Sequence, residues 1–234
     1  MLYLYIGGFI LLLLILLFSS RTRIREKYNK YTKIANERGL NGVEVANIII
    51  NQKNLNISLA QDDEDLCDAY FPKERTLLMS GKVCNHPSIA SVAIVCHELG
   101  HATQHKEGTF LYRSNMFLGK LTRFTNKLIV PLLVFGLLFY TIKWPTPDIG
   151  LTLCITSATL FLLHAIVKII IIPLEFDASK RALKMIQENQ LLTKKEIRKS
   201  KSLLNTAGQT YIVALFDDFR NMLYTIFRRR KRRR

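Results

Sequence analysis

Three long apolar runs place the strongest constraint on how this chain folds. Residues 2–18 carry no charged side chain, and further apolar runs cover residues 128–142 and 151–172. A helix of about 17 residues is about 26 Å long, close to the thickness of the hydrocarbon core of a bilayer. The runs therefore predict a mainly α-helical membrane protein with three transmembrane helices.

The basic residues lie apart from the apolar runs and indicate the orientation of the chain. Lys and Arg total 34 against 18 Asp and Glu, for a net charge of +16. Six basic side chains fall within residues 21–33, directly after the first run, and residues 228–234 are all Lys or Arg. Because segments rich in Lys and Arg stay on the cytoplasmic side of a membrane, we expect a multi-pass protein of the cell (inner) membrane with cytoplasmic basic segments.

The apolar runs also divide the chain. The predicted parts are a transmembrane anchor (1–19), a cytoplasmic part (20–127), a transmembrane hairpin (128–172), a second cytoplasmic helical part (173–227) and a basic tail (228–234). A fourth hydrophobic stretch, residues 207–227, contains Asp217, Asp218 and Arg220, and charges at mid-depth in a bilayer are costly. We expect this stretch to pack on the cytoplasmic domain or to lie in the membrane interface, with a fourth span as the alternative.

The cytoplasmic part between the first two runs shows both helical and strand patterns. Asn41 is a candidate N-cap for a short helix that follows it. Residues 55–59 and 76–80 alternate or are rich in strand-forming residues, and a turn at 72–75 precedes the second stretch, which predicts a small antiparallel sheet. Pro87 and Ser88 then mark the start of a helix over residues 89–106, and Gly108 is its stop signal.

That last helix contains the pattern H-E-x-x-H at His97, Glu98 and His101. Four residues advance a helix by about 400°, so the two histidines lie one turn apart on one face and both reach a single Zn²⁺. Glu98 is offset by about 100°, which suits a general base better than a metal ligand. The alternative interpretation is a pair of surface histidines, but the apolar residues 92–96 before the motif indicate a buried helix.

A catalytic zinc site needs a third protein ligand and one open position. His105 is a poor candidate because three histidines on one straight helix do not converge tetrahedrally on one ion. Glu175 follows the third apolar run on the same predicted side of the membrane as His97, where Pro173 is expected to end the span and begin a new helix. An acid near a helix N-terminus is also favoured by the helix dipole alone, yet that explanation does not account for the return of the chain to the motif.

Taken together, these segments resemble the YugP-like bacterial membrane-bound neutral zinc metallopeptidases. The resemblance spans most of the chain and is carried in order by an apolar anchor, residues 42–46, residues 68–72, Leu78, Ser80 and Gly81, residues 97–105, Glu107 and Gly108, residues 173–179, and Thr210 and Tyr211. It implies a zincin-like α+β cytoplasmic domain, one Zn²⁺ held by His97, His101 and Glu175, and Glu98 as the catalytic residue of an endopeptidase.

The layout is also similar to the HtpX and CAAX proteases, whose gluzincin-type sites carry an Asp four residues after the ligand Glu. This sequence has Ser179 at that place, so Asp177 becomes the candidate partner of a ligand histidine. Tyr211 and His105 are alternative candidates for stabilising the oxyanion. An extended substrate is expected to pair with the strand at 76–80.

The expected substrates are polypeptides, membrane proteins above all, because the site would lie just beneath the bilayer. A competing hypothesis is a catalytically inactive membrane protein whose basic tail binds anionic lipid or nucleic acid. The tail has no interleaved aromatic residues and no nucleic-acid-binding motif around it, so a nucleic-acid partner is not expected.

Overall fold

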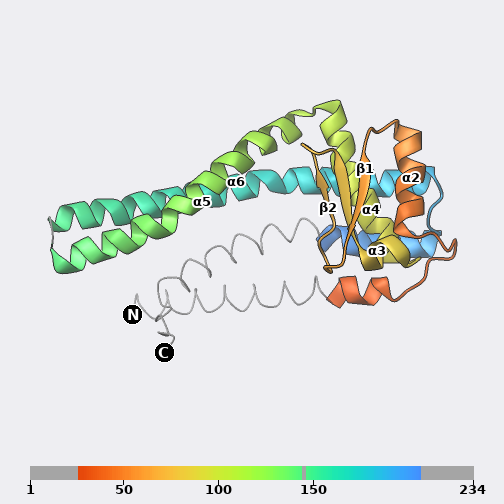
Figure 1. Ribbon diagram of the computed structural model, residues 1–234, viewed down its shortest axis with the longest axis horizontal. Helices are drawn as coiled ribbons and strands as arrows, with labels where there is room; N and C mark the ends of the chain where they lie inside the picture. Colours follow the sequence, from red (N-terminus) through yellow and green to blue (C-terminus); the bar gives the residue numbers. More distant parts are fainter. Residues whose placement is uncertain (1–25, 144–145, 207–234) are drawn as a thin grey trace. The chain divides into compact units, whose positions relative to one another are not determined.

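The computed structural model describes residues 26–143 and 146–206, and these divide into two compact units. One unit contains residues 26–113 together with 173–206, and the other contains 114–172. The first unit holds a three-stranded sheet and most of the helices, and the second consists of two long helical segments (Figure 1). The predicted anchor, the stretch 207–227 and the basic tail lie outside the described residues.

The first unit begins with a helical segment at residues 26–32 and continues into helix α2, Gly42–Lys53. Asn41 caps α2 as predicted, since its side chain accepts a hydrogen bond from the backbone N–H of Glu44. The Glu44 carboxylate reaches back to the N–H of Asn41, which completes a capping box. The buried face of α2, with Val45 and Ile49, packs into the core of the unit.

The sheet is mixed, so the prediction of an antiparallel sheet is wrong. Its strands are β1 (Ser58–Asp62), β2 (Ala69–Phe71) and β3 (Thr76–Ser80), in the spatial order β1-β3-β2. β2 and β3 form an antiparallel hairpin, but β1 pairs with β3 in parallel. Because β3 lies between the other two strands, an added substrate strand has no free edge of β3 to pair with. A short helix, α3 (Gly81–Asn85), follows β3 directly.

Helix α4, Ile89–Glu107, crosses the core and agrees with the predicted helix. The Ser88 side chain accepts from the N–H of Ser91 at its start, and Gly108, with φ of 60°, ends it in the left-handed conformation. The buried face of α4 contains Val92, Val95, Cys96 and Leu99, which are all fully buried. These side chains form one hydrophobic cluster with residues of α2 and β3. The C-terminal part of the unit adds Ala182, Met185, Ile186, Leu191, Leu192, Leu203 and Leu204 to this cluster.

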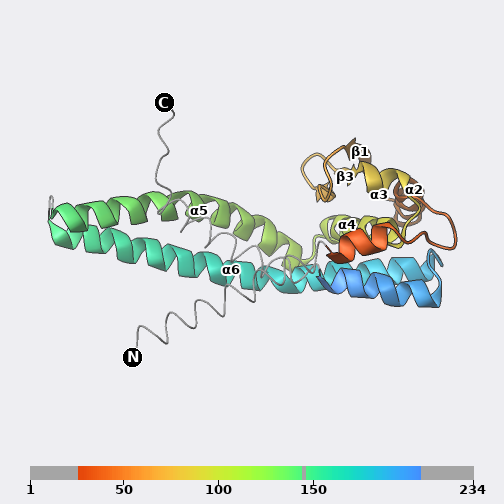
Figure 2. The same cartoon turned by 90° about the horizontal axis from the view of Figure 1, so that it is seen from below.

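The second unit is built from two helices that pass out of it into the first. Helix α5 is Phe110–Ile142 and helix α6 is Pro147–Glu188, and their parts in this unit run side by side (Figure 2). Small residues let them approach, since a Cβ on Gly136 would lie 2.8 Å from the sulfur of Cys154. The Ser157 hydroxyl also donates to the carbonyl of Ile129 at 2.8 Å.

The structure contradicts the prediction of three transmembrane helices, or four. Within the described residues only α6 is long and apolar enough to cross a membrane. The apolar part of α5, Lys127–Ile142, is a shorter segment, because polar and basic residues interrupt the sequence before it. Pro173 does not begin a new helix, since α6 continues through it to Glu188.

Candidate metal centre

Helix α4 presents His97 and His101 on one face, as their spacing predicts. Their rings lie edge to face with centroids 4.9 Å apart. The side of α4 that enters the hydrophobic cluster fixes the rotation of the helix, so both imidazoles point toward α6. His97 is 8% exposed, which excludes the alternative interpretation of two surface histidines.

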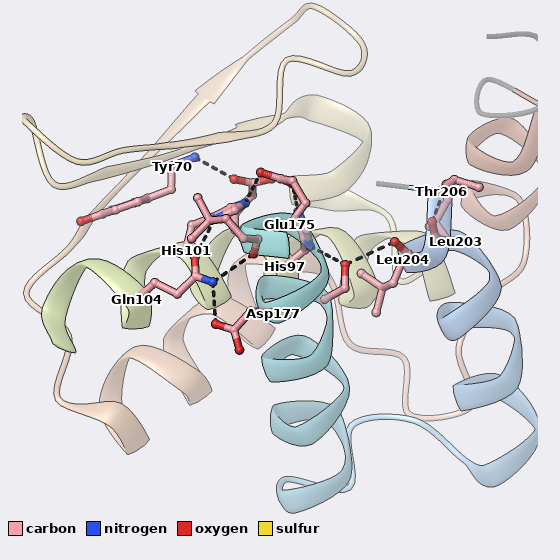
Figure 3. A network of polar contacts seen from close by, with 12 residues as sticks. Tyr70, His97, His101, Gln104, Glu175, Asp177, Leu203, Leu204 and Thr206 are labelled. Atoms are coloured by element: carbon pink, nitrogen blue, oxygen red, sulfur yellow. Dashed lines mark hydrogen bonds and ion pairs between the residues drawn. The ribbon is translucent and has the colours of Figure 1, made fainter. Parts of the chain in front are cut away.

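Helix α6 brings Glu175 to these two histidines (Figure 3). Its carboxylate oxygens lie 3.3 Å from Nε2 of His97 and 3.4 Å from Nε2 of His101. Glycine makes this approach possible, because a Cβ on Gly100 would lie 2.7 Å from the backbone oxygen of Ala178. Glu175 is 5% exposed, so the structure places its carboxylate next to two imidazoles at a position that is largely buried from solvent.

The three side chains fit a zinc ion in both chemistry and spacing. His₂Glu is a known ligand set of catalytic zinc, and ligand atoms about 2.0–2.1 Å from a tetrahedral ion are separated by about 3.3–3.4 Å. The ligand atoms of His97, His101 and Glu175 all lie within 4.8 Å of one another, and their closest N–O separations match that tetrahedral edge. A fourth position would be left for water or substrate.

Hydrogen bonds on the far side of each imidazole leave the Nε2 atoms available to a metal. Ser179 donates its hydroxyl to the carbonyl of Leu204, so it accepts from Nδ1–H of His97 at 3.2 Å. Nδ1–H of His101 donates to the side-chain oxygen of Gln104 at 3.0 Å. Each ring therefore holds a proton on Nδ1, so Nε2, the nitrogen that faces Glu175, is the atom that would bind a metal after losing any proton it carries.

Gln104 is itself held in a fixed orientation. It is fully buried, and its amide nitrogen donates to the carbonyl of Leu174 at 3.1 Å and to Asp177 at 2.7 Å. Asp177 also accepts from Arg181 at 2.7 Å. Asp177 thus reaches His101 through Gln104 rather than directly, which the sequence did not reveal (Figure 3).

Glu98 lies beside the cluster and is bonded to the sheet. Its carboxylate accepts from the backbone N–H of Tyr70, on β2, at 2.9 Å. Burial raises the pKa of Glu98 above its ordinary value, and the neighbouring His97 opposes this rise. A carboxylate with a raised pKa next to a candidate metal position is the arrangement expected of a general base.

The electrostatics of the three candidate ligands depend on one another. Burial alone would raise the pKa of Glu175, but hydrogen bonds from His101 and His97 outweigh it and hold this pKa well below its usual range. Burial alone would lower the pKa of His101, yet the carboxylate of Glu175 raises it to about 9. In the absence of a metal, a proton on His101 therefore offsets the negative charge of Glu175.

The remaining candidates lie elsewhere. His105 is hydrogen-bonded through Nδ1 to the Tyr70 hydroxyl at 2.8 Å and stacks on Tyr112, so it is not part of the ligand cluster. Tyr211 lies outside the described residues. Sequence reasoning missed Gln104 and the backbone N–H of Tyr70; only the helical spacing of Gln104, three residues after His101, could have indicated it.

The site has the ligand set of a zinc enzyme, and comparison with known proteins gives the family. The sequence model of a family described as "putative neutral zinc metallopeptidase" matches residues 6–230, so the chain belongs to that family. The predicted resemblance is thereby confirmed.

A relative named "Putative membrane protease YugP", from Bacillus subtilis (strain 168), is 28% identical over 200 residues. The match covers 84% of this chain and 84% of the relative. No solved structure is significantly similar.

Proposed function

We propose that this protein is a membrane-bound, zinc-dependent endopeptidase with a gluzincin-type site. The observation that carries the proposal is the convergence of His97, His101 and Glu175 within 4.8 Å, with Glu98 on the adjoining face of α4. Family membership and the printed name of the relative support the same class of enzyme.

The chemistry follows from what each side chain holds. A bound zinc ion would supply a Lewis acid that polarises the scissile carbonyl and lowers the pKa of a water molecule to about 7. His97, His101 and Glu175 would hold that ion, while Ser179 and Gln104 accept hydrogen bonds from the Nδ1 atoms and keep Nε2 directed at the metal position. Glu98 takes the proton of the attacking water and later delivers it to the leaving amine.

The free edge of β2 is the natural place for a polypeptide substrate. β2 is an edge strand next to β3, and the N–H of Tyr70 points away from β3 toward Glu98. An extended peptide that adds to this edge by main-chain hydrogen bonds would pass directly by Glu98. This geometry favours extended, unfolded segments over folded proteins as substrates.

We place the site at the cytoplasmic surface of a membrane. The apolar run 151–172 ends three residues before Glu175 in the same helix, which corresponds to about 4.5 Å along the helix axis. The basic residues 21–33 favour the cytoplasmic side. Substrates would therefore be membrane proteins or segments close to the bilayer.

Replacement of the proposed base tests the function. We expect Glu98→Gln, in detergent-purified full-length protein, to lower turnover of a casein-like substrate by roughly 100-fold or more while zinc content stays unchanged. Glu188→Gln is the matched control, because Glu188 lies at the end of α6 and pairs with Lys53 rather than with the site. Unchanged turnover in Glu98→Gln would contradict the proposal.

A further inference from the structure

The first half of α5 contains a short repeat that the proposed active site does not use. A phenylalanine recurs every seven residues, and a basic residue follows each one by three positions: Phe110, Phe117 and Phe124, with Arg113, Lys120 and Lys127. The three phenylalanines are 83%, 69% and 63% exposed, respectively. A row of exposed aromatic rings along one helix face is a candidate interaction surface.

Helix geometry arranges the repeat as two parallel stripes. Seven residues advance an α-helix by about 700°, which is about 20° short of two full turns, so Phe117 and Phe124 lie almost in line. A residue three positions on is rotated by about 300°, so Lys120 and Lys127 form a second stripe about 60° to one side. All four side chains are exposed.

The side of α5 that lies about 100–140° around the helix axis from Phe124 is buried, which fixes the orientation of the stripes. Thr125 is 3% and Ile129 is 2% exposed, and the carbonyl of Ile129 accepts the hydroxyl of Ser157 on α6. The phenylalanine stripe is therefore the outward face of the helix within its unit.

The charge of this segment selects the partner. No Asp or Glu occurs between Glu107 and Asp148, so nothing on α5 balances the basic stripe. The stripe would repel a second copy of itself and attract a surface rich in phosphate. It also ends where the shorter apolar segment Lys127–Ile142 begins, so the stripe is continuous with the apolar part of α5.

We propose that residues 110–127 of α5 lie in the membrane interface, with Phe117 and Phe124 at the level of the upper acyl chains and Lys120 and Lys127 on the phosphates of anionic lipids. Amphipathic helices with aromatic and basic faces bind membranes in this way. The inference rests on the membrane location in the proposed function but not on peptidase activity, so zinc binding and proteolysis are irrelevant to its test.

The depth of the two rings can be measured by fluorescence. Trp144 is the only tryptophan, so Phe117→Trp and Phe124→Trp are made separately in a Trp144→Phe background. The full chain is reconstituted in phosphatidylcholine vesicles with phosphatidylglycerol, in which the acyl chains carry bromine near the glycerol. We expect roughly twofold quenching at both positions. Ile48→Trp, an exposed control on α2, is expected to stay unquenched.

A second arm tests the basic stripe. Lys120→Gln with Lys127→Gln should reduce the quenching in vesicles with phosphatidylglycerol and leave it unchanged in vesicles of phosphatidylcholine alone. Quenching at 117 and 124 no greater than at the control position would overturn the proposal. Disulfide-linked dimers of Phe117→Cys without lipid quenching would equally overturn it, because they would assign the stripe to a second copy.

Discussion

Among single residues, Gln104 contacts a candidate zinc ligand although it lies outside the H-E-x-x-H motif. His97, Glu98, His101 and Glu175 were all predicted from the sequence, because helix periodicity and the position after an apolar run point to them. Gln104 and the N–H of Tyr70 were not, since their contacts depend on where α6 and β2 pack against α4. The place of Ser179 was noted from the sequence, but its contact with His97 was not.

Gln104 should act on zinc binding through His101. We expect Gln104→Met, which keeps the volume but removes the acceptor for Nδ1–H, to weaken zinc affinity by roughly 10- to 100-fold. Competition with a chelator measures the affinity, and Gln187→Met on the exposed side of α6 is the control. Equal affinities in the Gln104 variant and the wild type would show that this hydrogen bond does not position the ring.

Zinc binding should release a proton near neutral pH. The pKa of His101 is raised to about 9 by Glu175, so this ring is protonated at pH 7 in the metal-free protein. The ring must lose that proton to bind zinc, and affinity should therefore fall as pH decreases below about 9, by up to about tenfold per pH unit. Calorimetry in two buffers of different ionisation enthalpy detects the proton; a heat that is independent of buffer would contradict this prediction.

At the scale of elements, the sequence predicted most helices but not the order of the strands. Caps at Asn41, Ser88 and Gly108 are local signals, and they marked α2 and α4 correctly. Strand order depends on long-range pairing, so nothing local revealed that β3 lies between β1 and β2. Pro173 is tolerated within α6, although the lack of an N–H in proline predicted a break.

The contact between α4 and α6 is the structural basis of the site, and Gly100 controls it. Gly100→Ala would place a methyl group 2.7 Å from the backbone oxygen of Ala178, so α6 must move away from α4 and take Glu175 with it. We expect a loss of about 1–3 kcal/mol in the free energy of unfolding, together with weaker zinc binding. Denaturant titration of the metal-free protein measures the first effect.

Gly81→Ala is the control for this substitution, because a Cβ there would meet its nearest atom at 3.4 Å, an ordinary contact. If Gly100→Ala were as stable as Gly81→Ala and bound zinc equally well, the close approach of the two helices would not be required for the site.

At the scale of the whole molecule, α6 connects the apolar part of the chain with the candidate ligand. Hydropathy located the apolar runs but did not predict the number of transmembrane helices correctly. The apolar part of α5 is too short to count as a candidate membrane span. The three ligand atoms, by contrast, meet within one compact unit formed by residues far apart in sequence. Their assembly follows from α6 returning the chain to α4.

The most direct test of this assembly is metal analysis of the detergent-purified full-length protein alongside its Glu175→Ala variant. We predict one zinc ion per chain in the wild type and in the control Glu188→Ala, and loss of that zinc in Glu175→Ala. Retention of zinc by Glu175→Ala, with the same affinity as the wild type, would show that α6 does not supply the third ligand and would contradict the site described above.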